Sequence, residues 1–243
     1  MIILTRAIGL VSGKGGVGKT TVTANLGAAL TNVFKKNVVL VDMNVRSSHL
    51  GLHLGMYKDP PVTLRDVLMK KTSAIHAIYT HYFTGIRIVS APLNGQCGSV
   101  TQSKIKNLVN QIGNSYDMVL VDCAPGLGKE AMVAMNAVDE ALVVTTPDIS
   151  AITDAMKALE ILRKMNKNVL GIVLNRCENQ SYMLTQNEVE STCNCNVISK
   201  IPEDKKIPES IARGIPAVLL YPNSPSSRSL KGLAGYLCGE SYY

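Results

Sequence analysis

Short, nearly continuous runs of aliphatic residues recur along this chain and alternate with longer amphipathic segments. Such runs are typical of parallel strands that are buried on both faces of a sheet. They predict strands at residues 7–11, 37–41, 118–121, 140–145 and 169–174, and weaker ones at 86–89 and 196–199. Apolar positions at helical spacing predict helices at residues 20–35, 63–69, 101–112, 129–137, 149–165, 204–213 and 227–238. The alternation predicts an α/β fold with a doubly wound, mostly parallel β-sheet flanked by helices.

Length and composition agree with one compact domain that spans residues 1–243. The chain is 46% hydrophobic and 18% charged, and no low-complexity run divides it. No apolar stretch approaches the roughly 20 residues that a membrane span needs. The N-terminus lacks the layout of a signal peptide. We therefore expect a cytoplasmic protein whose six cysteines are reduced thiols.

Residues 13–21 read Gly-Lys-Gly-Gly-Val-Gly-Lys-Thr-Thr and satisfy the phosphate-loop pattern G-x4-G-K-[S/T]. The pattern lies between a predicted strand and a predicted helix, which is the order that the motif requires. Glycines let successive N–H groups turn toward phosphate oxygens, and the helix adds the positive end of its dipole. The expected nucleotide-binding residues are Gly13, Lys14, Gly15, Gly16, Val17, Gly18, Lys19, Thr20 and Thr21.

Three side chains of this loop have distinct expected tasks. Lys19 should reach the β- and γ-phosphates of the nucleotide, and Thr20 should bind Mg²⁺ through its hydroxyl. Thr21 is placed to bond the α-phosphate. The motif therefore predicts a site for a nucleoside triphosphate with magnesium.

Two predicted strands end in an aspartate, Asp42 and Asp122. Parallel strands bring their carboxyl ends to the sheet edge that carries the phosphate loop. Asp122 has the position of a Walker B carboxylate, which holds Mg²⁺ directly or through water. Asp42 is expected near the metal or the attacking water. The Pro125-Gly126 pair joins a stiff residue to a permissive one, which suits a segment that moves with the γ-phosphate.

The run K-G-G-x-G-K-T-T contains a second lysine, Lys14, and resembles the deviant Walker A motif of the MinD/ParA family of ATPases. The stretches at residues 38–44, 50–55, 116–128, 173–176 and 201–204 extend the resemblance to archaeal-type MinD proteins over nearly the whole chain. It implies an ATP-dependent homodimer in which Lys14 touches the phosphates bound by the other protomer. ATP and Mg²⁺ are the implied cofactors.

The resemblance also implies a base pocket. The amide of Asn175 would pair with the adenine edge, and Arg176, Pro202 and Asp204 would lie beside it, while Gly126 would lie near the γ-phosphate. The run Leu-Asn-Arg-Cys replaces the N-K-x-D pattern associated with guanine, which favours ATP.

The chain departs from the bacterial MinD and ParA pattern at two places. Their switch I reads D-x-D, whereas this chain reads Asp42-Met-Asn44. An amide orients water but cannot accept its proton. Since phosphoryl transfer depends mainly on positioning and charge stabilisation, we predict a slow ATPase with Lys14, Lys19, Asp42 and Asn44 as its catalytic residues. The second departure is in switch II, the segment after the strand-terminal Asp122 that contains Pro125 and Gly126. This chain reads Asp-Cys-Ala-Pro-Gly there, whereas MinD proteins usually read D-x-P-A-G.

Four functions compete at this level. The favoured one is a MinD-like switch ATPase in cell division or spatial regulation, which recruits or positions an unknown protein partner at its switch surface. An ATP-gated scaffold with little hydrolysis is the second, and a ParA-like DNA segregation ATPase the third. The fourth is a metallocluster carrier, for which the single pair Cys193 and Cys195 is the only sequence signal.

Charge and the last predicted helix bear on these alternatives. The net charge of +7 is compatible with DNA or a membrane, but no block of five like charges occurs, so solvated helix faces are the favoured explanation. Residues 227–238 carry an apolar face weakened by glycines, and packing against the sheet is favoured over peripheral membrane binding. The four histidines, His49, His53, His76 and His81, match no ligand spacing and are expected to be ordinary.

Overall fold

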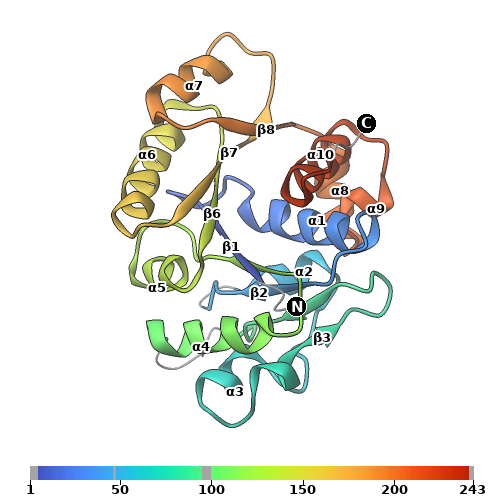
Figure 1. Cartoon of the computed structure of the whole chain (residues 1–243). Coiled ribbons are helices and arrows are strands. Elements are labelled where there is room, and N and C mark those ends of the chain that lie inside the picture. The colour runs from blue at the N-terminus through green and yellow to red at the C-terminus, as the bar shows by residue number, and fades with distance from the viewer. Residues whose placement is uncertain (1–4, 46–47, 95–99, 241–243) are drawn as a thin grey trace.

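The computed structural model describes residues 5–45, 48–94 and 100–240. Its eight strands form one sheet in the order β3-β4-β2-β5-β1-β6-β7-β8 (Figure 1). All pairings are parallel except the one between β3 and β4. The strands are β1 (Arg6–Val11), β2 (Val38–Asp42), β3 (Tyr79–Thr80), β4 (Arg87–Val89), β5 (Met118–Asp122), β6 (Glu140–Thr145), β7 (Asn168–Cys177) and β8 (Val197–Pro202).

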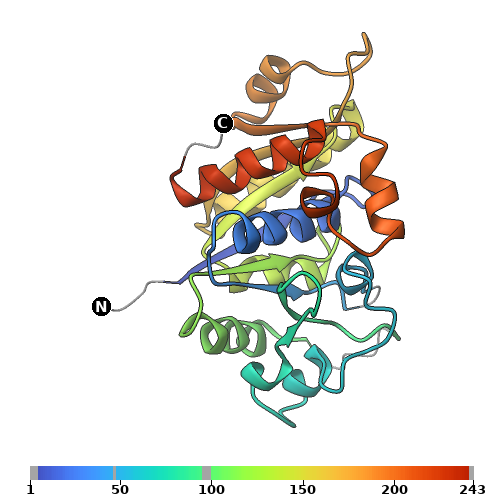
Figure 2. The same cartoon turned by 90° about the vertical axis from the view of Figure 1, so that its right-hand side faces the viewer.

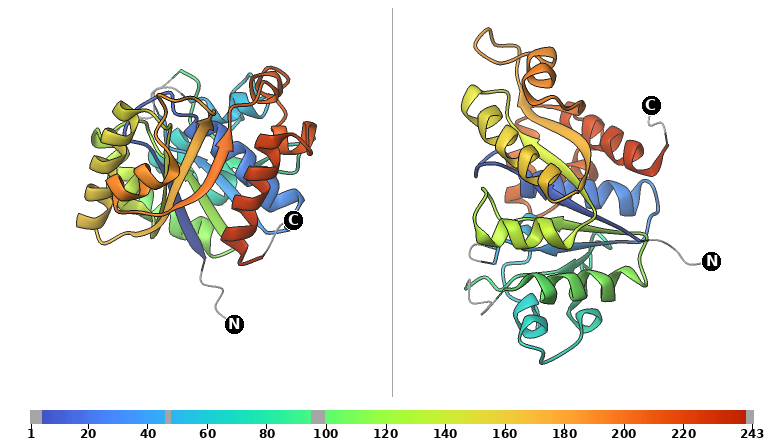
Figure 3. Two further views of the ribbon diagram at one scale, coloured as in Figure 1. Left: turned by 90° about the horizontal axis from the view of Figure 1, so that it is seen from above. Right: turned by 60° about the vertical axis from the view of Figure 1, so that its left-hand side comes forward.

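Helices cover both faces of the sheet, as Figures 1 and 2 show. The helices are α1 (Lys19–Asn32), α2 (Leu50–His53), α3 (Leu64–Leu68), α4 (Gln102–Gly113), α5 (Lys129–Ala137), α6 (Ile149–Lys164), α7 (Gln186–Cys193), α8 (Lys206–Ala212), α9 (Ala217–Leu220) and α10 (Pro225–Cys238), with the 3-10 helix η1 at Ala74–Ala77. Helices α1 and α10 lie on one face, and α4, α5 and α6 lie on the other (Figure 3).

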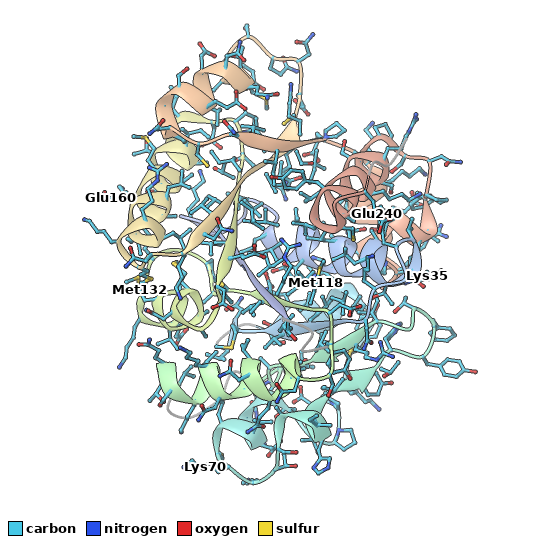
Figure 4. All side chains as sticks on the ribbon, in the orientation of Figure 1. Lys35, Lys70, Met118, Met132, Glu160 and Glu240 are labelled. Atoms are coloured by element: carbon cyan, nitrogen blue, oxygen red, sulfur yellow. The ribbon has the colours of Figure 1, made fainter. Side chains whose placement is uncertain are left out.

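Two apolar cores, one on each face, explain the continuous hydrophobic runs of the strands. In β5, Val119 and Val121 face the core that includes α4, while Met118 and Leu120 face the core that includes α1. Because successive side chains of a strand point to opposite faces, a strand covered on both sides must be apolar at every position. Met118, at the start of β5, lies inside the molecule in Figure 4.

The structure confirms the predicted fold class and every predicted helix and strand, with boundaries that shift by a few residues. Residues 227–238 lie in α10, where Leu230, Leu233 and Leu237 are buried against the α1 face, so the expected packing role is confirmed. Five short elements are not predicted by the hydrophobic pattern: β3, α2, η1, α7 and α9. Among the described residues, no helix is long and apolar enough to cross a membrane.

The strand order places a crevice at the centre of the sheet. Strand β1 pairs with β5 on one side and with β6 on the other, so the connections from these neighbouring strands leave in different directions. In open α/β sheets, ligands bind outside the carboxyl ends of the strands at such a point. The loop after β1, residues 12–18, begins there and leads into α1.

Candidate functional site

The loop between β1 and α1 depends on glycine at defined positions. Gly16 and Gly18 have φ angles of 84° and 88°, a left-handed conformation that side chains rarely adopt. A Cβ on Gly13 would lie 2.2 Å from the carbonyl oxygen of Asp154 in α6, and one on Gly18 would lie 2.2 Å from Nδ2 of Asn175. The loop is therefore shaped by close packing against α6 and β7, and it follows a path that larger residues would block.

Asp122, at the end of β5, gathers three groups from α1. Its Oδ1 lies 2.7 Å from Nζ of Lys19, and its Oδ2 accepts a hydrogen bond of 2.7 Å from the Thr20 hydroxyl. Thr23 donates a third bond to Oδ1 at 3.1 Å. Lys19 and Asp122 are both buried, so the pair is a desolvated ion pair with its remaining hydrogen-bonding capacity largely used.

Asp42 has a different environment from the one expected for a metal ligand. Its Oδ1 accepts from the Asn44 N–H at 2.9 Å, and its Oδ2 accepts from the Ser48 hydroxyl at 2.8 Å and from the Leu50 N–H at 3.3 Å. Burial, together with the nearby charge of Asp122, raises the pKa of Asp42 to about 7. Both of its oxygens thus hold residues that follow β2, and its expected place near the metal or the attacking water stays a prediction.

A cavity of about 710 Å³ lies in front of the loop. Residues 15–21 of the loop and α1 form one wall of it, and Asn44 and Ala124, Pro125 and Gly128 after β5 form others. The structure thus brings most of the phosphate loop, the Asn44 amide of switch I and switch II together around one cavity. Gly126, with φ of 76°, donates its N–H to the Ser12 carbonyl at 3.1 Å and so fixes switch II beside the loop.

A second cavity of about 270 Å³ continues from the first. Gly18, Thr21 and Arg176 line both cavities, so the two form one site with a polar and an apolar end. The apolar end is walled by the side chains of Val22, Ile201, Pro202, Ile207, Pro208 and Ile211. Such a narrow apolar slot beside a phosphate loop fits a flat nucleobase.

Asn175 lies at this junction but does not present its whole amide to the slot. Its Nδ2 donates a buried hydrogen bond of 2.8 Å to the Val17 carbonyl. The side chain can come this close because Gly18 has no Cβ. The amide therefore braces the phosphate loop with one of its two N–H groups. Its second N–H and its Oδ1 are the groups left for a base, and the expected pairing with the adenine edge stays a prediction.

Three further residues are expected beside the nucleobase, and each of them borders the slot in a different way. Arg176 adopts a φ of 56°, and its exposed guanidinium lies 3.9 Å from the Glu203 carboxylate. Pro202 forms part of the wall, whereas the Asp204 carboxylate accepts from the Lys206 N–H at 2.9 Å and the Ser226 hydroxyl at 2.7 Å. Burial raises the pKa of Asp204, but these hydrogen bonds lower it by more, so the pKa lies below its ordinary value. Its side chain joins α8 to α10, and so it borders the slot without a free carboxylate.

Lys14, the additional lysine of the loop, reaches α6. Its Nζ lies 3.2 Å from Oδ1 of Asp148 and 2.8 Å from the Ser150 hydroxyl. Asp148 also caps α6 by accepting the Ala151 N–H at 2.9 Å. Burial raises the pKa of Asp148, but hydrogen bonds from Thr146, Ala151, Ser150 and Lys14 lower it by more. The pKa therefore lies below its ordinary value, and Asp148 is an anion at neutral pH.

The cavity wall includes residues that motif reading did not select. His49 and His53 of the α2 segment line it, although the sequence analysis treated all four histidines as ordinary. Lys129 and Glu130 at the start of α5 line it as well. Their chain positions carry no motif, and only the fold brings them to the loop. Among the described residues, no cluster of three or more His, Cys, Asp or Glu side chains suits a metal ion.

The residues present fit a nucleotide with magnesium. The phosphate end offers Lys19 and the hydroxyls of Thr20 and Thr21 beside the glycine-rich loop, in which Gly18 leaves no room for a Cβ, and this arrangement suits an anion. The Thr20 hydroxyl and the Asp122 carboxylate lie in direct contact, an oxygen pair of the kind that Mg²⁺ takes. The apolar slot completes the site at the base end.

The comparisons with known proteins point to one family. Residues 4–238 match the family model named ParA, described as the NUBPL iron-transfer P-loop NTPase. An uncharacterised ATP-binding protein of Methanocaldococcus jannaschii is 33% identical over 241 residues, which cover 99% of this chain and 90% of that protein.

Solved structures of MinD proteins superpose on nearly all of the chain. The cell division ATPase MinD of Pyrococcus furiosus gives a TM-score of 0.90 at 36% identity, with 96% of this chain and 98% of that one covered. MinD of Pyrococcus horikoshii complexed with Mg-ADP gives 0.89 at 35% identity, with 96% of each chain covered. MinD in the MinC:MinD cell division complex of Aquifex aeolicus gives 0.87 at 30% identity, with 98% of each chain covered.

Proposed function

Because the chain belongs to the MinD/ParA family of P-loop ATPases, with ATP and Mg²⁺ as its cofactors, we propose that it is a slow switch ATPase of cell division or spatial regulation. ATP would join two copies of the chain through Lys14, and the dimer would recruit a protein partner at its switch surface. The family relation supports this proposal, since similar proteins are a cell division ATPase and the MinD subunit of a MinC complex.

The position of Lys14 is the observation that carries the proposal. The phosphate loop already has Lys19 in its interior, paired with Asp122. Lys14 instead lies at the rim, with a side chain that is 35% exposed and held by residues of the α6 N-terminus. A long, hydrated, flexible cation at a rim can exchange one anion for another at low cost. It is thus suited to reach a phosphate bound by a second copy.

Within the site, we assign Thr20 and Asp122 to the magnesium ion and Lys19 to the phosphates. Bound magnesium would neutralise charge on the phosphate oxygens. Asp42 would keep the segment after β2 in place, and Asn44, which lines the cavity, would orient water there by hydrogen bonding. The proposal includes a single domain that spans residues 1–243. It also includes a location in the cytoplasm or at the membrane periphery.

The dimer is tested by light scattering coupled to size exclusion, with Mg-ATP and with Mg-ADP, on the wild type and on Lys14→Ala. We expect an ATP-only dimer for the wild type and a monomer for the variant. Nucleotide affinity should change by less than about threefold, because an exposed charge contributes little to binding at a neighbouring position. A Lys14→Ala dimer with ATP would overturn the role of Lys14 across the interface.

The alternative of an ATP-gated scaffold rests on Asn44, which has no carboxylate to accept a proton. Phosphate release by the same sample separates the two functions, since a scaffold would form the dimer without release. For a slow ATPase, Asn44→Asp should raise turnover, by about 10-fold or more if the new carboxylate acts as a general base. An unchanged rate would show that this side chain does not limit hydrolysis.

A further inference from the structure

His53 is the last residue of α2 and lines the nucleotide cavity. Its Nε2 lies 3.2 Å from the hydroxyl oxygen of Thr21, and its Nδ1 lies 2.9 Å from the carbonyl oxygen of His49. A carbonyl oxygen only accepts hydrogen bonds, so Nδ1 carries the proton in the neutral ring. Nε2 is therefore the acceptor, and the Thr21 hydroxyl donates to it.

Thr21 is the residue at the junction of the two ends of the site. It lines both the phosphate cavity and the apolar slot, as a residue near the first phosphate after the nucleoside would. A threonine hydroxyl has a single proton. When this proton is donated to His53, it is not available to a phosphate oxygen.

We propose that His53 sets the affinity of the site for nucleotide by competing with the bound phosphate for the hydroxyl proton of Thr21. His53 is thus a positioning residue, because it acts through Thr21. It also joins the nucleotide to switch I, since α2 begins at Leu50, whose N–H is bonded to Asp42. This proposal rests on the nucleotide-binding part of the proposed function and needs neither the dimer nor hydrolysis.

The competition depends on the protonation of the ring. Burial lowers the pKa of His53 below its ordinary value of about 6.5, so the ring is neutral at pH 8. An imidazolium would instead donate from Nε2 to the Thr21 oxygen, which would release the hydroxyl proton to the phosphate. The neutral ring therefore opposes binding and the charged ring does not.

The charged groups around His53 come from four elements. His49 directly precedes α2, Lys19 lies on α1 and Asp122 on β5, and their fields act on the ring in addition to burial. Helix α8 also packs on α2, but its charged residues pair with one another: Glu209 accepts from Lys206 at 2.8 Å and from Arg213 at 3.0 Å. The nucleotide and Asp42 titrate in the same range, so the test compares variants rather than absolute affinities.

The experiment is calorimetric titration of the full chain with Mg-ADP at pH 8.0 and 5.5. At pH 8.0, His53→Leu should bind about 3- to 10-fold more tightly than the wild type, the gain expected when one competing hydrogen bond is removed. At pH 5.5 this ratio should shrink toward one. His53→Gln retains a side-chain acceptor that does not titrate, so it should bind like the wild type at pH 8.0 and more weakly than the wild type at pH 5.5.

A double-mutant cycle shows whether His53 acts through Thr21. Thr21→Val should weaken binding, and adding His53→Leu to it should then change nothing. The matched control is His76→Leu, because His76 has a similar contact of 3.2 Å with the Thr72 hydroxyl outside the cavity. The proposal is overturned if His53→Leu binds no more tightly, or if its gain persists without the Thr21 hydroxyl. Thermal melts identify a variant that fails to fold, in which case His53→Gln alone, by its pH profile, decides.

Discussion

The two lysines of the phosphate loop lie five positions apart and form ion pairs of opposite character. At the floor of the site, Lys19 and Asp122 have side chains that are 6% and 1% exposed. At the rim, Lys14 and Asp148 are 35% and 49% exposed. The floor pair shares its carboxylate with two hydroxyls of α1, whereas the rim pair shares it with the first turn of α6.

Burial decides what each pair can do. An ion pair out of water is held by a strong interaction, and removal of one member leaves a costly uncompensated charge. An exposed pair contributes between about 0 and 1 kcal/mol, so water or another anion replaces it easily. The floor is therefore a fixed binding element, and the rim is an exchangeable contact. The proposed switch needs both properties within one loop.

The largest expected effect is that of Lys19→Ala at the floor. It leaves Asp122 buried without its cation, so the free energy of unfolding should fall by about 3 to 5 kcal/mol. Affinity for Mg-ATP should fall by about 10- to 100-fold through the loss of a charged hydrogen bond. Chemical unfolding and nucleotide titration measure the two effects separately.

Lys164→Ala is the matched control for that variant. Its partner Glu160, 2.6 Å away, projects from the outer side of α6 (Figure 4), and the pair is exposed at both ends. Its loss should cost no more than about 0.5 kcal/mol. Equal losses of stability in the two variants would remove the distinction between the floor and the surface.

Asp42→Asn extends the comparison to a buried carboxylate without a cation. The folded-state pKa of Asp42, about 7, lies above its unfolded value, so the folded protein binds the extra proton between about pH 4 and pH 7. The free energy of unfolding of the wild type should therefore fall as pH rises through this window and level off above it. The total fall is on the order of 4 kcal/mol.

The measurement is the difference between wild type and Asp42→Asn across pH 4.5 to 8.5 in urea unfolding without nucleotide. Titrating groups that do not interact with Asp42 contribute alike to both proteins, so the difference isolates Asp42 together with its interaction with Asp122. A difference that stays constant with pH would show that Asp42 is an ordinary ionised carboxylate in the folded chain.

The sequence predicts the central strands well because they are buried on both faces and must be apolar throughout. It fails for β3, whose two residues are exposed at the sheet edge and carry no pattern. Helix α7 is short and polar, but Thr185 and Glu188 form a capping box that could have revealed its start. Helices α2 and α9 have only four residues each, too few for a periodic signal.

The residues of the candidate site also fall into a group that the sequence predicts and a group that it does not. Contiguous motif residues reveal the floor, because a phosphate loop needs its glycines and lysine in one run. The partners of those residues depend on the fold: Asn175 reaches Val17 through the space left by Gly18, and His53 reaches Thr21 from a short helix. The end of its strand and the resemblance to switch I place Asp42 at the site, but spacing cannot show that Asn44, Ser48 and Leu50 use both of its oxygens.

The smallest expected effect is at the rim, where Asp148→Asn tests whether the contact is exchangeable. An asparagine caps α6 nearly as well as an aspartate, so the free energy of unfolding should change by less than about 0.5 kcal/mol. Lys14 loses its anionic partner and keeps only the Ser150 hydroxyl. If Lys14 must leave Asp148 to reach a second copy, the ATP concentration for half-maximal dimerisation should fall by up to about fivefold, the equivalent of one exposed ion pair. Glu160→Gln removes a similar exposed pair on the same helix and should leave dimerisation unchanged. A higher ATP requirement in Asp148→Asn would instead mean that Asp148 helps the dimer, and the rim would be part of the interface rather than a contact that precedes it.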